Sequence, residues 1–164
     1  MAVSNKVVAH FGDGRVLKGS TQNFLPSRET FHVLPASGGA VLEVRTPQLK
    51  GLFFVKDLAG DPQRRDLRGF LSASGEAAHG KKIAVRFADG ELLCGYSLAF
   101  LPGRSGFFVF PCDSAGNNLR VYVVSSATVE VAAGPGADAL AKRVLARASD
   151  ERGGASRMRA AGGE

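Results

Sequence analysis

An internal repeat constrains the fold of this 164-residue chain more than any other feature. When the sequence is shifted by 76 positions, residues 6–35 lie over residues 82–111 without a gap. Thirteen of these thirty positions are identical, and they include matching Asp-Gly and Phe-Leu-Pro segments. The identical pairs are Lys6/Lys82, Phe11/Phe87, Asp13/Asp89, Gly14/Gly90, Leu17/Leu93, Gly19/Gly95, Phe24/Phe100, Leu25/Leu101, Pro26/Pro102, Arg28/Arg104, Phe31/Phe107, Val33/Val109 and Pro35/Pro111. The sequence therefore predicts two copies of one structural unit.

Short alternating segments within each copy predict strands that have one buried face. In residues 82–87 the apolar side chains fall on every second position, and residues 7–11 repeat this pattern. Phe11 and Phe87 end these two apolar faces, so we expect both rings to be buried. The Asp-Gly pair that follows each segment is typical of a tight hairpin.

A long second strand and a third strand follow in each copy. Gly19 and Gly95 lie in the middle of the second strand, where a glycine commonly allows a bend. A regular hairpin between the second and third strands of the second copy places Cys94 opposite Cys112, whereas a bulge near Gly95 would shift that register by one.

The copies diverge beyond their shared prolines. A seven-residue adjustment places residues 52–55 over residues 121–124, which we interpret as equivalent fourth strands. The second copy then continues with a fifth strand at 128–131, for which this alignment gives the first copy no counterpart. The first copy instead has an insertion over 36–47, in which Val41–Arg45 alternates like a strand. Either this inserted strand fills the missing place, or the two copies share strands.

The composition agrees with many turns and short strands. The chain has 21 Gly and 7 Pro, and 45% of its residues are apolar, which suffices for a packed core. Five short strands with a bent second strand are typical of a small SH3-like barrel. We therefore predict an all-β protein of two tandem small SH3-like barrels with a short C-terminal helix. The expected parts are a first barrel (1–58), a linker (59–80), a second barrel (81–133), a helix (134–149) and a disordered tail (150–164).

The pattern apolar-x-apolar-x-Phe-x-Asp-Gly over 83–90, followed by Gly95 and Phe100, resembles the first motif of Sm-like proteins. The whole chain also resembles a bacterial tandem family of unknown function whose units occur as regulatory modules, most clearly at 106–111 and 117–124. The resemblance implies that the two SH3-like barrels are Sm-like barrels, and it implies no activity. Sm-like RNA binders carry basic residues in their loops, and Arg28 and Arg104 are the residues here that match such a role.

The linker contains Arg64, Arg65 and Arg68, whose guanidinium groups suit phosphate. The spacing of Arg64 and Arg68 is similar to the arginine motif of PilZ domains, which implies binding of cyclic di-GMP. The alternative interpretation is a solvated linker whose arginines pair with Asp61 and Asp66.

The remaining features predict a binding protein and no enzyme. We recognise no catalytic motif, metal-ligand spacing or cofactor motif, so we expect no cofactor and no metal. The net charge of +6 is spread along the chain, which is too dilute to require a nucleic acid. The start of the sequence lacks the apolar run of a signal peptide, and no segment is long enough to span a membrane. We expect a bacterial cytoplasmic adaptor that contacts a protein partner, with cyclic dinucleotide or RNA binding as the alternative and no membrane contact.

Overall fold

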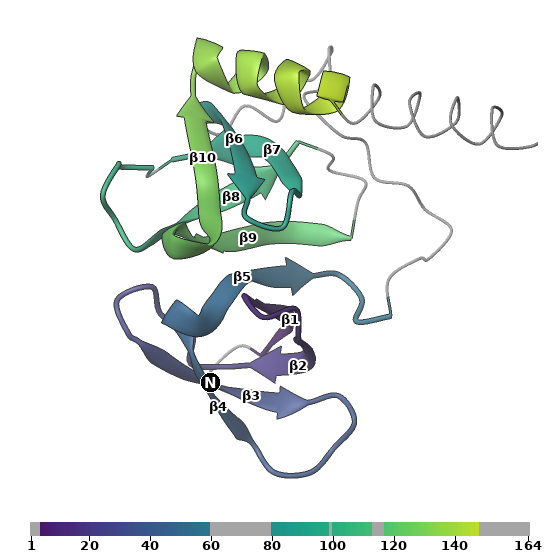
Figure 1. Cartoon of the computed structure of the whole chain (residues 1–164). Coiled ribbons are helices and arrows are strands. Elements are labelled where there is room, and N and C mark those ends of the chain that lie inside the picture. Colours follow the sequence, from purple (N-terminus) through teal and green to yellow (C-terminus); the bar gives the residue numbers. More distant parts are fainter. Residues whose placement is uncertain (1–3, 60–79, 99, 113–116, 148–164) are drawn as a thin grey trace, which may run out of the picture.

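The structure, a computed structural model, describes residues 4–59, 80–98, 100–112 and 117–147. Ten antiparallel strands form one sheet in the order β10-β6-β7-β8-β9-β5-β1-β2-β3-β4 (Figure 1). The strands are β1 (Asn5–Phe11), β2 (Val16–Thr21), β3 (Thr30–Pro35), β4 (Leu42–Arg45), β5 (Leu49–Val55), β6 (Lys81–Phe87), β7 (Leu92–Ser97), β8 (Gly106–Pro111), β9 (Asn118–Val124) and β10 (Thr128–Ala133). A helix over 135–147 follows β10. The prediction of a mostly β chain with a C-terminal helix is confirmed.

The two copies of the repeat fold alike over their first three strands. The bounds of β1, β2 and β3 recur in β6, β7 and β8 after 76 residues. Both Asp-Gly hairpins have the same hydrogen bond, in which the aspartate side chain accepts from the backbone N–H two residues later. We call β1–β5 the first half of the sheet and β6–β10 the second half. In each half the first strand pairs with the second and also with the last strand. The last strand follows a short 3₁₀ turn, which is η1 (Thr46–Gln48) in the first half and η3 (Ser125–Ala127) in the second.

The expected alignment of the later strands is wrong. In the β3–β4 pair Phe31 lies opposite Val44, and in the β8–β9 pair its counterpart Phe107 lies opposite Val123. The inserted strand β4 is therefore the equivalent of β9, and β5 is the equivalent of β10. Residues 52–55 resemble 121–124 because both segments are buried on both faces of the sheet, and such a strand needs a continuous apolar run.

The copies are joined by direct pairing of β5 with β9. The prediction of two tandem barrels is not confirmed, because the strand pairing gives one continuous sheet that does not close, with β10 and β4 at its edges. The reason is that β1 pairs with one edge of β5, and β9 pairs with the N–H and C=O groups of the other edge.

Each half of the sheet completes its hydrophobic core with residues from the other half. The core of the second half includes Val8, Phe53 and Val55 from the first half. The core of the first half includes Tyr122 and Val124 from β9. The two halves therefore depend on each other for burial.

The C-terminal helix covers a third cluster, on β6 and β7. Leu140 of the helix is fully buried against Ala84 and Tyr96, together with both cysteines. Pairing of Gly95 with Pro111 and a 3.1 Å hydrogen bond from the Cys112 N–H to the Cys94 carbonyl confirm the predicted register, in which these cysteines are cross-strand neighbours.

The glycines expected at bends are required for close approach between strands. A Cβ atom at Gly19 would lie 2.2 Å from the carbonyl oxygen of Leu34, and one at Gly95 would lie 2.2 Å from that of Phe110. Only glycine lets the second strand of each copy pass this close to the third strand.

A buried lysine links the two copies electrostatically. Lys50 lies on β5, and its Nζ donates to Asp89 at 2.7 Å and to Glu91, both in the β6–β7 turn. The same ammonium lies 4.7 Å from the centre of the Phe87 ring. Burial would lower the pKa of Lys50, but the two carboxylates outweigh burial and raise it. Burial would likewise raise the pKa of Asp89, and the hydrogen bond from Lys50 lowers it instead.

The first copy lacks this cover, and one burial prediction is wrong for that reason. Phe87 is 1% exposed, as predicted. Phe11 is only half-buried, with the guanidinium of Arg15 4.6 Å from its ring centre. Arg15 itself pairs with Asp13, and both side chains are exposed.

We predict an unequal cost for the two equivalent phenylalanines. Phe87→Ala should lower the free energy of unfolding by about 3–5 kcal/mol, because it empties a fully buried site. Phe11→Ala should cost clearly less, because part of that ring already contacts water. Urea unfolding of both variants measures the difference, and equal losses would contradict it.

The lysine link predicts a defined pH dependence. Replacing both carboxylates, Asp89→Asn with Glu91→Gln, leaves the buried Lys50 without counter-charges and should lower the free energy of unfolding by about 1–3 kcal/mol at neutral pH. Because the pKa of Asp89 is lowered in the folded state, the wild type should lose this advantage as the pH falls below 3.8.

Urea unfolding at several pH values tests this dependence. Asp13→Asn is the matched control, because that carboxylate pairs only with an exposed arginine in the equivalent turn. A pH-independent difference between the double variant and the wild type would show that the link does not stabilise the fold electrostatically.

Candidate functional site

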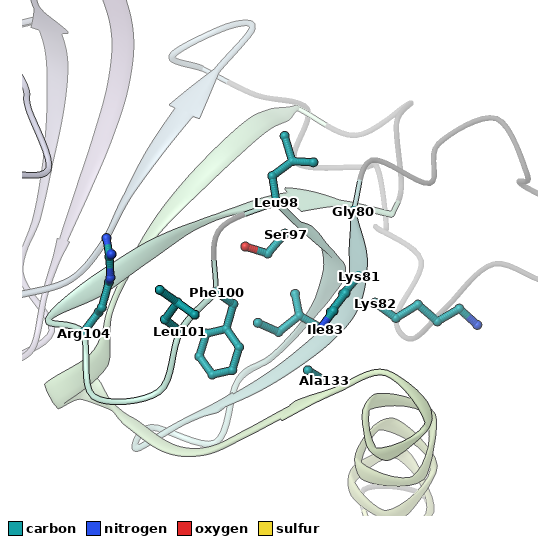
Figure 2. A pocket seen from close by; sticks show the side chains of 10 residues that line it. All are labelled: Gly80, Lys81, Lys82, Ile83, Ser97, Leu98, Phe100, Leu101, Arg104 and Ala133. Carbon is teal, nitrogen blue, oxygen red and sulfur yellow. The ribbon is translucent and has the colours of Figure 1, made fainter.

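A cavity of about 370 Å³ opens at one end of the second half (Figure 2). The start of β6, the end of β7, the β7–β8 loop and the end of β10 surround it. The lining residues are Gly80, Lys81, Lys82, Ile83, Ser97, Leu98, Phe100, Leu101, Arg104 and Ala133.

The floor of the cavity is apolar and well supported. Ile83 is fully buried, and the ring of Phe100 contacts Phe107 edge-to-face with centroids 4.8 Å apart. The hydroxyl of Ser97 donates to the Phe108 carbonyl at 2.7 Å, so this polar group is already satisfied. Leu101 lies at the rim and is half exposed. The cavity thus offers a fixed apolar surface that is open to solvent.

The rim of the cavity is basic. Its lining contains three basic side chains and no acidic one. Lys81 and Arg104 are exposed, whereas Lys82 points away from the cavity and lies 3.3 Å from Asp138 of the helix (Figure 2). The positive charge at the mouth therefore comes mainly from Lys81 and Arg104.

Hydrogen bonds to η3 hold the loop that carries Arg104. The Ser125 hydroxyl donates to the Arg104 carbonyl at 2.7 Å, and the Ser125 N–H donates to the Ser105 carbonyl at 2.9 Å. The backbone of the loop is thereby fixed while the guanidinium stays in solvent.

The cavity lies where the two copies differ, because in the first half the rings of Phe54, Phe108 and Tyr122 all pack against Phe24. Ala133 pairs with Ile83, and its counterpart Phe54 pairs with Val7. In the first half Phe54 packs against Phe24, the counterpart of Phe100, with ring centroids 5.9 Å apart. An alanine at position 133 leaves this volume empty in the second half.

The predicted site residues are separated by the structure. Arg104 lines the cavity, whereas Arg28 lies in the equivalent turn of the first half and does not line it. Arg64, Arg65 and Arg68 lie outside the described residues. The sequence analysis missed Lys81, Phe100 and Ala133, and the replacement of Phe54 by Ala133 becomes visible only when β5 is aligned with β10.

Other chemistry is sparse in the part of the chain that the structure describes. No group of three or more His, Cys, Asp or Glu side chains there is placed to hold a metal ion. Burial and the nearby Lys50 lower the pKa of His10, which packs on Phe53. Within the described residues, every helix is too short or too polar to cross a membrane.

Fold and site together define a mostly β protein of two repeated halves with an apolar, basic-rimmed cavity in the second. The chain belongs to a family of unknown function (DUF6982), whose model matches residues 3–133. The match covers all ten strands and ends with β10, so the C-terminal helix lies beyond it. No curated protein and no solved structure matches the chain.

We predict that two glycines near the mouth of the cavity differ in how much their substitution by alanine lowers the melting temperature. Gly80 has a φ of +93°, and a Cβ there would lie 2.4 Å from the Ser97 carbonyl oxygen. Gly103 has a similar φ of +86° but open space around it. Gly80→Ala should therefore lower the melting temperature clearly more than Gly103→Ala, because only the first adds a clash to the backbone strain. Equal melting temperatures would contradict the close approach at Gly80.

Proposed function

We propose that this protein is a non-catalytic binding module that holds a partner protein through the cavity of its second half. In this proposal each half is an SH3-like or Sm-like unit, and the protein acts as an adaptor in a bacterial cytoplasm. The apolar floor beneath a basic rim is the observation that carries the proposal. The repeated strand order, in which the last strand flanks the first, supports the assignment of the units.

The chemistry of the cavity favours a peptide segment that combines an apolar side chain with acidic neighbours. A volume of about 370 Å³ is at the small end for ligand pockets and suits one or two anchoring side chains. Lys81 and Arg104 lie at the rim, where their charges attract carboxylates and orient the segment.

An anionic nucleotide is less well matched to this cavity. Phosphate recognition commonly uses paired guanidinium groups, and Arg104 is the single arginine of the lining. The apolar floor also contributes nothing to phosphate. Cyclic dinucleotide or RNA binding is therefore the competing outcome that the experiment must distinguish.

Selection from a random peptide library, with the wild type as bait, tests the proposal. We expect enriched peptides that carry a Leu or Phe next to Asp or Glu. Affinities of the selected peptides are then measured by fluorescence polarisation, with cyclic di-GMP and a short RNA titrated in parallel.

Two variants connect binding to the cavity. Ala133→Phe should weaken peptide binding at least about tenfold without lowering the melting temperature, because the first half already accommodates a phenylalanine at this position. Arg104→Glu should also weaken binding, and Arg28→Glu, in the equivalent turn of the first half, should not. Unchanged affinity of Ala133→Phe, or binding of the nucleotides alone, would overturn the proposal.

A further inference from the structure

A second cavity, of about 340 Å³, lies where the two halves meet. Strands β1, β2 and β5 and the residues after β5 line it from the first half, and the β6–β7 turn and the start of β9 line it from the second. We name it the junction cavity. Its apolar side chains include Val8, Phe53 and Val55, and its polar ones include His10, Lys18 and Asn118. Small-ligand sites commonly lie at such interfaces, and the volume is at the small end of their range.

The floor of the junction cavity is apolar and rigidly supported. Val8, Phe53 and Val55 are buried and belong to the core cluster of the second half. Leu58, which follows β5, packs against the same cluster. The ring of His10 lies on that of Phe53, with centroids 4.6 Å apart. The part of a ligand that rests on this floor must therefore be apolar.

The polar side chains of the junction cavity that remain available are hydrogen-bond donors. Those of Lys18 and Asn118 form no hydrogen bond or ion pair with another described residue. The lowered pKa of His10 keeps its ring neutral at pH 7, so one ring nitrogen can donate. Among the described lining residues Glu91 is the only acid, and its carboxylate pairs with Lys50. The free groups thus suit an acceptor that carries negative charge.

The equivalent place in the second half shows which acceptor fits. Arg86 stands there at the position of His10, and its guanidinium lies 3.8 Å from the carboxylate of Glu130. That carboxylate also accepts from Arg143 of the helix at 2.7 Å. In the first half Gly51 takes the place of Glu130 and lies opposite His10. The second half thus supplies its own carboxylate, whereas the first half has none in this place.

The chain has a steric reason for the glycine. A Cβ atom at Gly51 would lie 3.0 Å from the carbonyl oxygen of Tyr122, because β9 pairs closely with β5 here. A glutamate at this position would push the two halves apart. A carboxylate beside His10 and Lys18 must therefore come from outside this strand.

We propose that the junction cavity binds a small carboxylic acid with an apolar body. The carboxylate accepts hydrogen bonds from Lys18, Asn118 and the His10 ring, and the apolar body rests on the floor. The site is separate from the peptide cavity of the second half, with which it shares no lining residue. Because both halves line the junction cavity, the bound acid stabilises the folded chain and raises its melting temperature.

NMR titration of the isotope-labelled wild type with phenylacetate tests the proposal. We expect saturable shifts in the backbone signals of β1, β2 and the start of β9, together with a higher melting temperature. Phenylacetamide keeps the shape without the charge, and inorganic phosphate keeps the charge without the apolar body. Each should bind at least about tenfold more weakly, because it lacks one half of the recognition. Equal binding of either compound, shifts confined to other residues, or no shifts at all would overturn the proposal.

Three variants connect binding to the junction cavity. Lys18→Gln should weaken phenylacetate binding about tenfold, because it removes a charged donor. Lys6→Gln is the matched control, because Lys6 is exposed on β1 but does not line the cavity, and it should bind like wild type. His10→Phe keeps a ring on Phe53 and removes both nitrogens, so it should also weaken binding. Melting temperatures without ligand establish that all three fold.

The outcomes separate this site from the peptide site. Ala133→Phe, which fills the cavity of the second half, should leave the affinity for phenylacetate unchanged. A loss of phenylacetate binding in Ala133→Phe would place the acid in the other cavity and overturn the proposal. Unchanged affinity in Lys18→Gln, or an equal loss in Lys6→Gln, would also overturn it.

Discussion

Pairing of β5 with β9 is the interaction on which the rest of this structure depends. A strand edge that faces no partner leaves its N–H and C=O groups to water, and β5 avoids this by pairing with β1 on one side and β9 on the other. All seven of its residues are buried, because hydrophobic clusters also cover both faces of the strand. Because Phe53 and Phe54 enter the cores on opposite faces of this strand, neither half of the sheet has a complete core of its own. The two repeats therefore form one cooperative body.

Duplication of a unit places equivalent positions in different surroundings, and the two halves use them differently. Lys50 lies in the junction and is held by two carboxylates, whereas Val129 occupies the same position at a free edge. Phe54 fills the space beside Phe24, whereas Ala133 leaves it open. The first half thus supplies packing and electrostatic support, and the second half supplies the cavity. This division follows from single side-chain differences between two halves that share one strand order.

The sequence predicted those features that depend on local chemistry. The Asp-Gly hairpins and the register of Cys94 against Cys112 follow from turn geometry and strand alternation, and the structure contains both. The order of the later strands failed, because an apolar run such as 52–55 reports burial on both faces and not position in the sheet. The half-burial of Phe11 and the cavity at Ala133 depend on contacts between distant strands, which alternation does not encode.

The cavity and the β10 edge meet at one residue, Ala133. Its equivalent Phe54 lies on β5, where Arg120 of the neighbouring strand β9 places its guanidinium 4.3 Å from the centre of the Phe54 ring. The other contact of that ring is Phe24, with centroids 5.9 Å apart, so neighbouring strands cover this position in the first half. Ala133 lies on β10 at the edge of the sheet, where β6 is the paired strand, and the side of the cavity beside it is open to solvent. The place of the strand in the sheet and the size of one side chain therefore act together to give the second half its cavity.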